Sequence, residues 1–361
     1  MLRSYLIFIT LLSIIIYSTT PGRNKSKGIL FCQVAGILLF LLYALRSPYC
    51  GTSDVLRYQE GYELYSSFNF STTIDEIAGG TLEPGYLFLQ WVFGNVFGFQ
   101  WWLAFIAFLS IGSTMYLVKR MSPIPYISIL LFFSLGFMNF EIDGLRQTIA
   151  MSILLWAYYP LRDRHLIGFL ALVVLASVFH STALVFILAY PFAYKKIGII
   201  HLGVFIAAAA LFFLFKDRLL PILAFFLSAS DHFTELYALG DGVSLSMTGF
   251  YIQLLLFMFE LFFMNRVICR YPNSALLFNL AFIGLCFQLY AAFIGVFFRI
   301  SLYFSFYHLL LFPMALSVIA NKKVRIFVTI AASLVFLAYS LFFLQLSDYG
   351  FFWQHVNLTE V

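Results

Sequence analysis

Two residues that lipid does not favour, Arg146 and His180, stand at the far ends of two apolar segments that share one basic turn. Arg146 lies 16 residues before Arg162, and His180 lies 16 residues after Arg164. If both segments are α-helices, each polar group stands about 24 Å from the turn, short of the roughly 30 Å hydrocarbon core. The spacing predicts that a guanidinium and an imidazole reach similar depth near one surface of a membrane.

Arginine and histidine at such depth can bind charge and move protons, but each has a plain structural alternative. An intramembrane charge is costly, and the planar fork of Arg146 fits the oxygens of a diphosphate. The alternative is an arginine that extends to the lipid headgroups, with Asp143 as helix N-cap and as partner three positions earlier. His180 is either a general base or a histidine held by a hydrogen bond to Ser181 or Thr182.

A second arginine, Arg299, is predicted at an outer turn between two late spans, with Tyr303 following at helical spacing. Positive charge is normally depleted on the outer side of a membrane. We therefore expect Arg146 and Arg299 to hold one anionic ligand. The carboxylates predicted on the same side, each a candidate general base or a solvated loop residue, are Asp54, Glu83 and Glu141.

The elements that position these residues must be membrane helices. Of the 361 residues, 63% are hydrophobic and 10% are charged, and the mean hydropathy is +0.95, which excludes a soluble globular protein. The sequence predicts an all-α fold, a polytopic transmembrane helical bundle with one integral membrane domain over residues 1–361. The net charge of +5 lies in short clusters between apolar runs, which indicates membrane orientation and not nucleic-acid binding.

Basic clusters set the topology, because lysine and arginine collect on the inner side of a membrane. One pair of spans between successive clusters gives about twelve crossings of roughly 20 residues. Segments 46–84 and 216–246 are predicted periplasmic loops. For residues 85–118 we expect a short half-helix near 85–98 and then one span, with two crossings as the alternative. The clusters are 119–120, 162–165, 195–196, 266–270 and 322–325.

Motifs of nucleotide and metal chemistry are not found. The sequence has no Gly-rich phosphate loop, no His-Glu-x-x-His motif, no Asp-x-Asp metal pair and no Gly-x-Ser-x-Gly elbow. We therefore predict no metal and no cofactor, and a cytoplasmic nucleotide-using enzyme is disfavoured. Two isolated residues in late spans are interpreted as structural: Glu260 as a hydrogen-bonded residue of the bundle, with a proton path as the alternative, and His308 as a packing residue.

Short phrases in order along the chain carry a likeness to a known family: Gly51-Thr52-Ser53-Asp54 with Tyr58, Glu83-Pro84-Gly85-Tyr86, Gly144-Leu145-Arg146-Gln147, Phe179-His180-Ser181-Thr182, and Arg299 with Tyr303-Phe304. This pattern resembles the EpsG/Wzy group of polysaccharide polymerases. The likeness runs from residue 51 to beyond 300, and it is most specific around Arg146 and His180.

The resemblance implies an enzyme of the bacterial inner membrane that joins repeat units carried on undecaprenyl diphosphate, at the periplasmic face, into an O-antigen, capsule or exopolysaccharide. In this hypothesis Arg146 and Arg299 hold the diphosphates. His180 is the base or a second clamp, and Glu83 or Asp54 is the competing base. The other residues predicted to bind substrate are Asp143, Gln147, Tyr58, Tyr62, Tyr86 and Tyr303.

Two other classes of protein remain as alternatives. A flippase for lipid-linked oligosaccharide would place charges along a path through both leaflets, whereas the unusual charges here gather on one side. A membrane acyltransferase acting on surface glycan would need an inner donor site, which the sequence does not clearly contain. The sugar, its linkage and the participation of a chain-length regulator are left open by the sequence.

Overall fold

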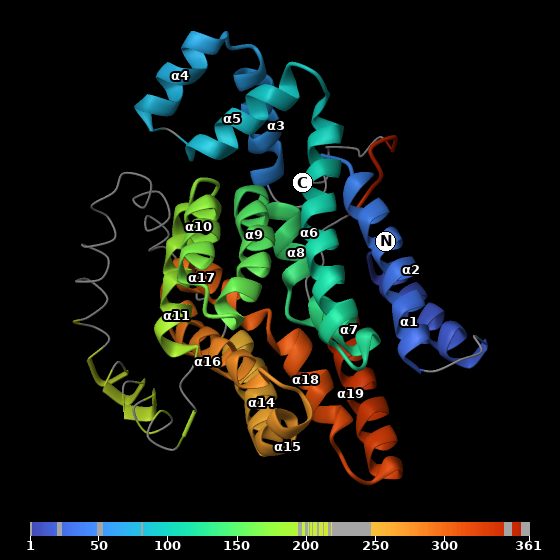
Figure 1. The fold of residues 1–361 in the computed structure, drawn as a ribbon. Coiled ribbons are helices and arrows are strands. Elements are labelled where there is room, and N and C mark those ends of the chain that lie inside the picture. The colour runs from blue at the N-terminus through green and yellow to red at the C-terminus, as the bar shows by residue number, and fades with distance from the viewer. Residues whose placement is uncertain are drawn as a thin grey trace. The chain divides into compact units, whose positions relative to one another are not determined.

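The computed structural model describes residues 2–19, 24–48, 53–80, 82–193, 197–198, scattered positions between 201 and 218, 247–342 and 349–354. Regular structure in these residues is helical (Figure 1), and the β-contact among them is an isolated antiparallel bridge between Arg46 and Phe351. The prediction of an all-α fold is therefore confirmed. The predicted loop 216–246 lies outside the described residues except for position 218, as does the basic pair 195–196.

The chain divides into two compact units, Met1–Ile187 with Phe312–Val361, and Leu188–Leu311. The helices of the first unit are α1 (Leu2–Thr19), α2 (Asn24–Ala44), α3 (Ser53–Ser66), α4 (Phe70–Gly79), α5 (Pro84–Gly94), α6 (Phe99–Met121), α7 (Pro125–Ser134), α8 (Phe137–Asp143), α9 (Leu145–Arg162), α10 (Leu166–Ser177), the 3-10 helix η1 (Ser181–Leu188) and α19 (Lys322–Phe342). The helices of the second unit are α11 (Ala189–Phe192), α14 (Thr248–Phe262), α15 (Met264–Arg270), α16 (Ser274–Ala291), α17 (Gly295–Ser305) and the start of α18 (His308–Ser317).

Four of the described helices are long and apolar enough to cross a membrane: residues 26–44 of α2, then α6, α16 and α19. The number rises to seven if each bent pair, α7 with α8, α14 with α15, and α17 with α18, is counted as one span. The bends within these pairs are 58°, 65° and 46°. The predicted count of about twelve crossings is not confirmed, because several apolar stretches form helices shorter than a full span.

Residues 85–118 form a short helix and one long one, as expected. Pro84 occupies the first turn of α5, where its missing N–H costs no hydrogen bond. Asn95 ends α5, and Gly98 in extended conformation precedes α6, whose 23 residues qualify as a span. The segment 46–84 is mainly helical as well, because it contains α3 and α4.

Helices α6 and α9 lie side by side and run in the same direction. Near the start of α6, Trp102 belongs to a cluster with Leu145 and Ile149 of α9. Near its end, the ring centroid of Tyr116 lies 4.7 Å from that of Trp156 and 6.2 Å from that of Tyr159. The ends of the two helices therefore match, and the start of α9 is held near α3 and α5.

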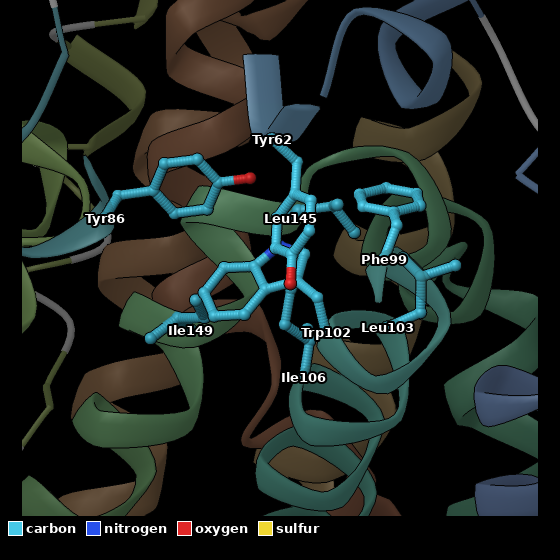
Figure 2. Packing of buried hydrophobic residues seen from close by; sticks show 8 residues of the cluster. All are labelled: Tyr62, Tyr86, Phe99, Trp102, Leu103, Ile106, Leu145 and Ile149. Carbon is cyan, nitrogen blue, oxygen red and sulfur yellow. The ribbon is translucent and has the colours of Figure 1, made fainter. Parts of the chain in front are cut away.

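An aromatic cluster joins these four helices (Figure 2), and Trp102 is at its centre. The ring centroid of Trp102 lies 5.6 Å from that of Tyr86 on α5 and 6.3 Å from that of Tyr62 on α3. Tyr62 donates its hydroxyl hydrogen to the Phe97 carbonyl at 2.8 Å. The cluster thus fixes α3 and α5 over the adjacent ends of α6 and α9.

Two glycines set the helix breaks that follow α6. Gly136 has a φ of +78° between α7 and α8, a conformation that a residue with a side chain rarely adopts. Gly144 separates α8 from α9 and is the residue that precedes α9. Asp143 is therefore the last residue of α8, whereas Arg146 lies on α9. The alternative in which Asp143 caps the helix of Arg146 is wrong, because Gly144 precedes that helix, and a role of Asp143 in substrate binding stays a prediction.

In the second unit, a buried acid lies against a buried histidine. Glu260 on α14 and His308 on α18 are fully buried, with His308 Nδ1 2.9 Å from each carboxylate oxygen of Glu260. Arg299 lies within α17, not in the outer turn where it was predicted, because the helix already begins at Gly295. Tyr303 follows Arg299 on α17 and is buried.

Substitution of two adjacent tryptophans tests the packing of the aromatic cluster. Trp102 is fully buried, whereas 65% of Trp101 is exposed. We expect Trp102→Ala to lower the free energy of unfolding by about 3–5 kcal/mol, since a large buried side chain is lost, and Trp101→Ala to change it by less than about 1 kcal/mol. Denaturant unfolding of both variants in the same detergent measures the difference, and equal losses would contradict the packing described.

Candidate functional site

The carboxylate of Glu83 brings together the two residues at which the sequence analysis began. Arg146 Nη1 donates to Glu83 Oε2 at 2.6 Å, and His180 Nδ1 lies 3.1 Å from Glu83 Oε1. The Ser181 backbone N–H also donates to Oε1, at 3.4 Å. Arg146 and His180 therefore lie next to each other, and the residue that joins them comes from a segment far away in the sequence.

Close backbone contact places Glu83 beside His180. The Gly85 N–H donates to the Val178 carbonyl at 3.0 Å, in the turn between α10 and η1. A Cβ at Gly85 would lie 2.5 Å from Val178 Cγ1 and 3.0 Å from the Val178 oxygen. Glycine is thus the residue that lets the start of α5 rest on this turn, with Glu83 just before it.

Helix α9 supplies Arg146 from its first turn, and a tyrosine from α3 covers the guanidinium. The Cζ atom of Arg146 lies 6.0 Å from the ring centroid of Tyr58, at cation–π range. The Tyr58 ring in turn lies 5.9 Å from that of Tyr86. Arg146 Nε is buried without a hydrogen-bond partner, while 23% of the side chain is exposed.

The surroundings of Glu83 keep it ionised. Burial alone raises the pKa of the Glu83 carboxyl, but the hydrogen bond with His180 and the charge of Arg146 outweigh it and lower the pKa to about 2. An ionised carboxylate only accepts hydrogen bonds, so the hydrogen between Glu83 and His180 resides on Nδ1. This arrangement orients the imidazole and makes Nε2 the nitrogen that is able to accept a proton when the ring is neutral.

The other predicted site residues are distributed more widely. Tyr58 lies at the site, and Asp54 lies one helical turn before it on α3, on the same side of the helix. Tyr62 and Tyr86 are 3% and 0% exposed, so their rings belong to the core and not to an accessible sugar-binding surface. Gln147 is buried in α9.

Arg299 and Tyr303 lie in the second unit, on α17. A ligand shared by Arg146 and Arg299 therefore stays a prediction.

Glu141, a candidate base by sequence, belongs to a separate buried cluster. Ser110 donates to Oε2 of Glu141, and Glu141 is 3% exposed.

The same cluster contains Arg46, which sequence analysis did not single out. Arg46 donates from Nη2 to the Ile142 carbonyl at 2.9 Å. Arg46 is 1% exposed and lies over the ring of Tyr43. Because Arg46 ends an apolar span, it could have been flagged by the same argument as Arg146.

The opposite ends of α6 and α9 are basic. Lys119 and Arg120 lie in the last turn of α6, and Arg162 lies in the last turn of α9. Arg120 and Arg162 stack on the rings of Tyr116 and Tyr159, at 5.5 and 5.2 Å from the centroids. The Glu83 site and this basic end are therefore separated by the length of a membrane span.

The fold and the site together define the class of protein. Apolar helices of span length, with charged residues at the two ends of the α6–α9 pair, define a helical membrane protein. The chain belongs to the EpsG family, whose family model matches residues 29–356. This membership indicates a polysaccharide polymerase type of role. No curated protein and no solved structure matches the chain.

Within the part of the chain that the structure describes, no group of three or more His, Cys, Asp or Glu side chains is arranged to hold a metal ion.

Neutralising Glu83 tests the electrostatics of the site. A pKa lowered from 4.5 to about 2 corresponds to about 3 kcal/mol of stabilisation, present in full above pH 4.5 and lost as the pH falls toward 2. We expect Glu83→Gln to lower the free energy of unfolding by about that amount, equally at pH 7 and pH 5.5. At pH 3.5 the difference between wild type and variant should be smaller by about 1 kcal/mol.

Glu63→Gln is the matched control, because Glu63 is an exposed carboxylate hydrogen-bonded to Gln59 on α3. Its effect should stay within about 0.5 kcal/mol. Unfolding of the three proteins by denaturant in detergent, at each pH, measures these differences. A Glu83→Gln protein as stable as the Glu63→Gln protein would contradict the ion pair.

Proposed function

We propose that the protein is a glycosyltransferase that polymerises oligosaccharide repeat units carried on undecaprenyl diphosphate. The observation that carries the proposal is the convergence of Arg146 and His180 on Glu83, since it combines an anion-binding group with a proton acceptor at one end of a helix pair. Membership of the EpsG family supports the same class of reaction.

Arg146 would bind the diphosphate that leaves. Its guanidinium offers several donors in one plane, and only Nη1 is engaged by Glu83 in the contacts described above. The buried Nε has no partner, and the side chain is partly exposed, so phosphate oxygens can reach the group. An arginine in a weakly hydrated site stabilises the negative charge that develops on the leaving diphosphate.

His180 would accept the proton of the attacking hydroxyl. The lowered pKa of Glu83 makes that carboxylate a weak base near neutral pH, although it is well placed to orient the imidazole. Glu83 is then a positioning residue for both Arg146 and His180, comparable in role to the acid that orients the histidine of a hydrolase triad. Asp54, one turn from Tyr58, is the competing base.

The transfer can be written so that its atoms balance. The bond between the anomeric carbon of the growing glycan and a diphosphate oxygen breaks, and the electron pair stays with the lipid diphosphate. A sugar hydroxyl of the incoming unit forms the new glycosidic bond to the same carbon, and its proton passes to His180. The protein contributes alignment of two membrane-anchored substrates, charge stabilisation and the base.

The proposal includes the orientation of the chain in the bacterial inner membrane. The basic end, with Lys119, Arg120 and Arg162, would face the cytoplasm, and Glu83 would then lie at the periplasmic side. Arg299 would bind the second diphosphate, and Tyr58 would offer the accessible aromatic face for sugar. If the chain crosses the membrane about twelve times, with roughly 20 residues per crossing, the shorter apolar helices would have to combine into single membrane spans.

Replacing Arg146 tests the reaction class in cells. In a strain that lacks its own copy, Arg146→Ala should abolish long glycan chains while single-unit surface glycan persists, because flipping does not need the site. Arg146→Lys should fail as well, since a lysine keeps the charge but not the fork. The measurement is the chain-length ladder of surface glycan, with protein level checked in membranes.

Arg57→Ala is the matched control, because Arg57 is an exposed arginine next to Tyr58 on α3. It should leave the ladder intact. An unchanged ladder in Arg146→Ala would remove Arg146 from the mechanism. Loss of all surface glycan would favour a flippase, and a ladder that lacks only acyl groups would favour an acyltransferase.

Two variants discriminate between the candidate bases. With purified protein and lipid-linked repeat units alone, His180→Gln should lower the rate by about 10²–10⁴, whereas Asp54→Asn should lower it far less. Initial rates of ladder formation measure both. The reverse order of the two losses would make Asp54 the base and leave His180 as a clamp for the diphosphate.

A further inference from the structure

At the basic end of the first unit, a groove runs between α1, α7 and α19. Its deep part encloses about 370 Å³, within the range of roughly 300–1,000 Å³ seen in small-molecule sites, and includes Ile14 and Leu337 in its lining. A second, shallower cavity of about 340 Å³ contains Arg325. Ile124, Thr329 and Ile330 line both cavities, so the two form one continuous groove.

The deep part of the groove is suited to hydrocarbon. The Tyr126 hydroxyl lines it beside Thr10 and Ser333. Three other lining hydroxyls donate to carbonyls of their own helices: Ser13 to Thr10 at 2.7 Å, Thr329 to Arg325 at 2.8 Å and Ser333 to Thr329 at 2.7 Å. Such side chains present mainly apolar surface to a ligand. Only 6% of the apolar stretch of α19 is buried within the protein, so most of this helix is exposed on the protein surface.

The shallow part of the groove is suited to an anion. Arg325 is half-buried, and its Nη1 donates to the Ser317 carbonyl at 3.3 Å, which holds the guanidinium at the mouth of the groove. Lys322 and Lys323 begin the same helix. Among the described residues that line the two cavities there is no carboxylate, so the positive charge at the mouth is not neutralised within the groove.

We propose that this groove binds one anionic phospholipid, with its phosphate at Arg325 and one acyl chain between α1, α7 and α19. The positive charge at the mouth and the apolar interior together favour an amphiphilic ligand with a negatively charged head group. Because Pro123 and Ile124, just after the end of α6, line the groove, it opens at the basic end and is distinct from the Glu83 site.

Native mass spectrometry tests the proposal. The full chain would be released from nanodiscs that contain phosphatidylglycerol and phosphatidylcholine in equal amounts. Wild type should retain one phosphatidylglycerol, and Arg325→Gln should retain it about fivefold less, as expected for one surface charge against an anionic lipid. Arg325→Lys should retain most of the binding, because a charge is sufficient at the mouth.

Two matched controls separate the groove from general charge and general surface effects. Arg120→Gln removes an exposed arginine from the same end of the protein, outside the groove, and should retain the lipid. Ser333→Phe fills the deep part and should lose the lipid, whereas Val335→Phe, at a position that is 64% exposed and outside the groove, should keep it.

Several results would overturn the proposal. These are equal retention of the two lipids, equal loss in Arg325→Gln and Arg120→Gln, retention in Ser333→Phe, and displacement of the lipid by millimolar inorganic phosphate. A dimer without bound lipid would also overturn it, since a second copy of the chain would then cover α19. Size-exclusion profiles of each variant in detergent establish that it is folded.

Discussion

One carboxylate, that of Glu83, accepts hydrogen bonds from groups far apart in the chain, and the geometry of the site depends on it. Glu83 precedes α5, Arg146 begins α9, and His180 lies between α10 and η1, yet all three side chains meet. Without Glu83, the guanidinium would be a partly buried charge with no counter-ion, which is costly in a membrane protein. With it, the arginine and the histidine share a fixed geometry, in which the arginine is partly exposed and the histidine is buried.

The rest of the first unit is arranged to hold that geometry. The aromatic cluster around Trp102 fixes α3 and α5 over the starts of α6 and α9 (Figure 2), and the contact between Gly85 and Val178 brings Glu83 onto the turn that carries His180. Dispersion and hydrophobic burial thus determine where the charges lie. The basic ends of α6 and α9 lie a span away, so the Glu83 site and this basic end occupy opposite ends of one helix pair.

Much of this could be predicted from residue types and spacing, because membrane helices have a regular rise and lipid excludes charge. The all-α fold, the short α5 followed by α6, and the proximity of Arg146 and His180 all follow from those two constraints. The partner role of Glu83 did not follow, since no spacing rule connects residue 83 with residue 180. The helix break at Gly144 was also missed, because a glycine within an apolar run is tolerated in many helices.

The spacing of residues in the sequence also does not predict which side chains are buried. Tyr62 and Tyr86 have the sequence surroundings of ligand-binding tyrosines, but packing against Trp102 takes their rings into the core. Glu141 has the position of a loop carboxylate and is instead buried beside Ser110. In each case a tertiary contact decides between an accessible and a structural role, and a local pattern does not contain that contact.

In the proposed reaction, Glu83 and Arg146 form a diphosphate site in which the carboxylate and the ligand compete for one guanidinium. Binding of undecaprenyl diphosphate to purified protein tests it most directly. The account predicts that Arg146→Gln weakens binding at least about tenfold, the effect of losing about 1.4 kcal/mol, and that Glu83→Gln binds the lipid as well as or better than wild type. Equal affinity of wild type and Arg146→Gln would contradict it.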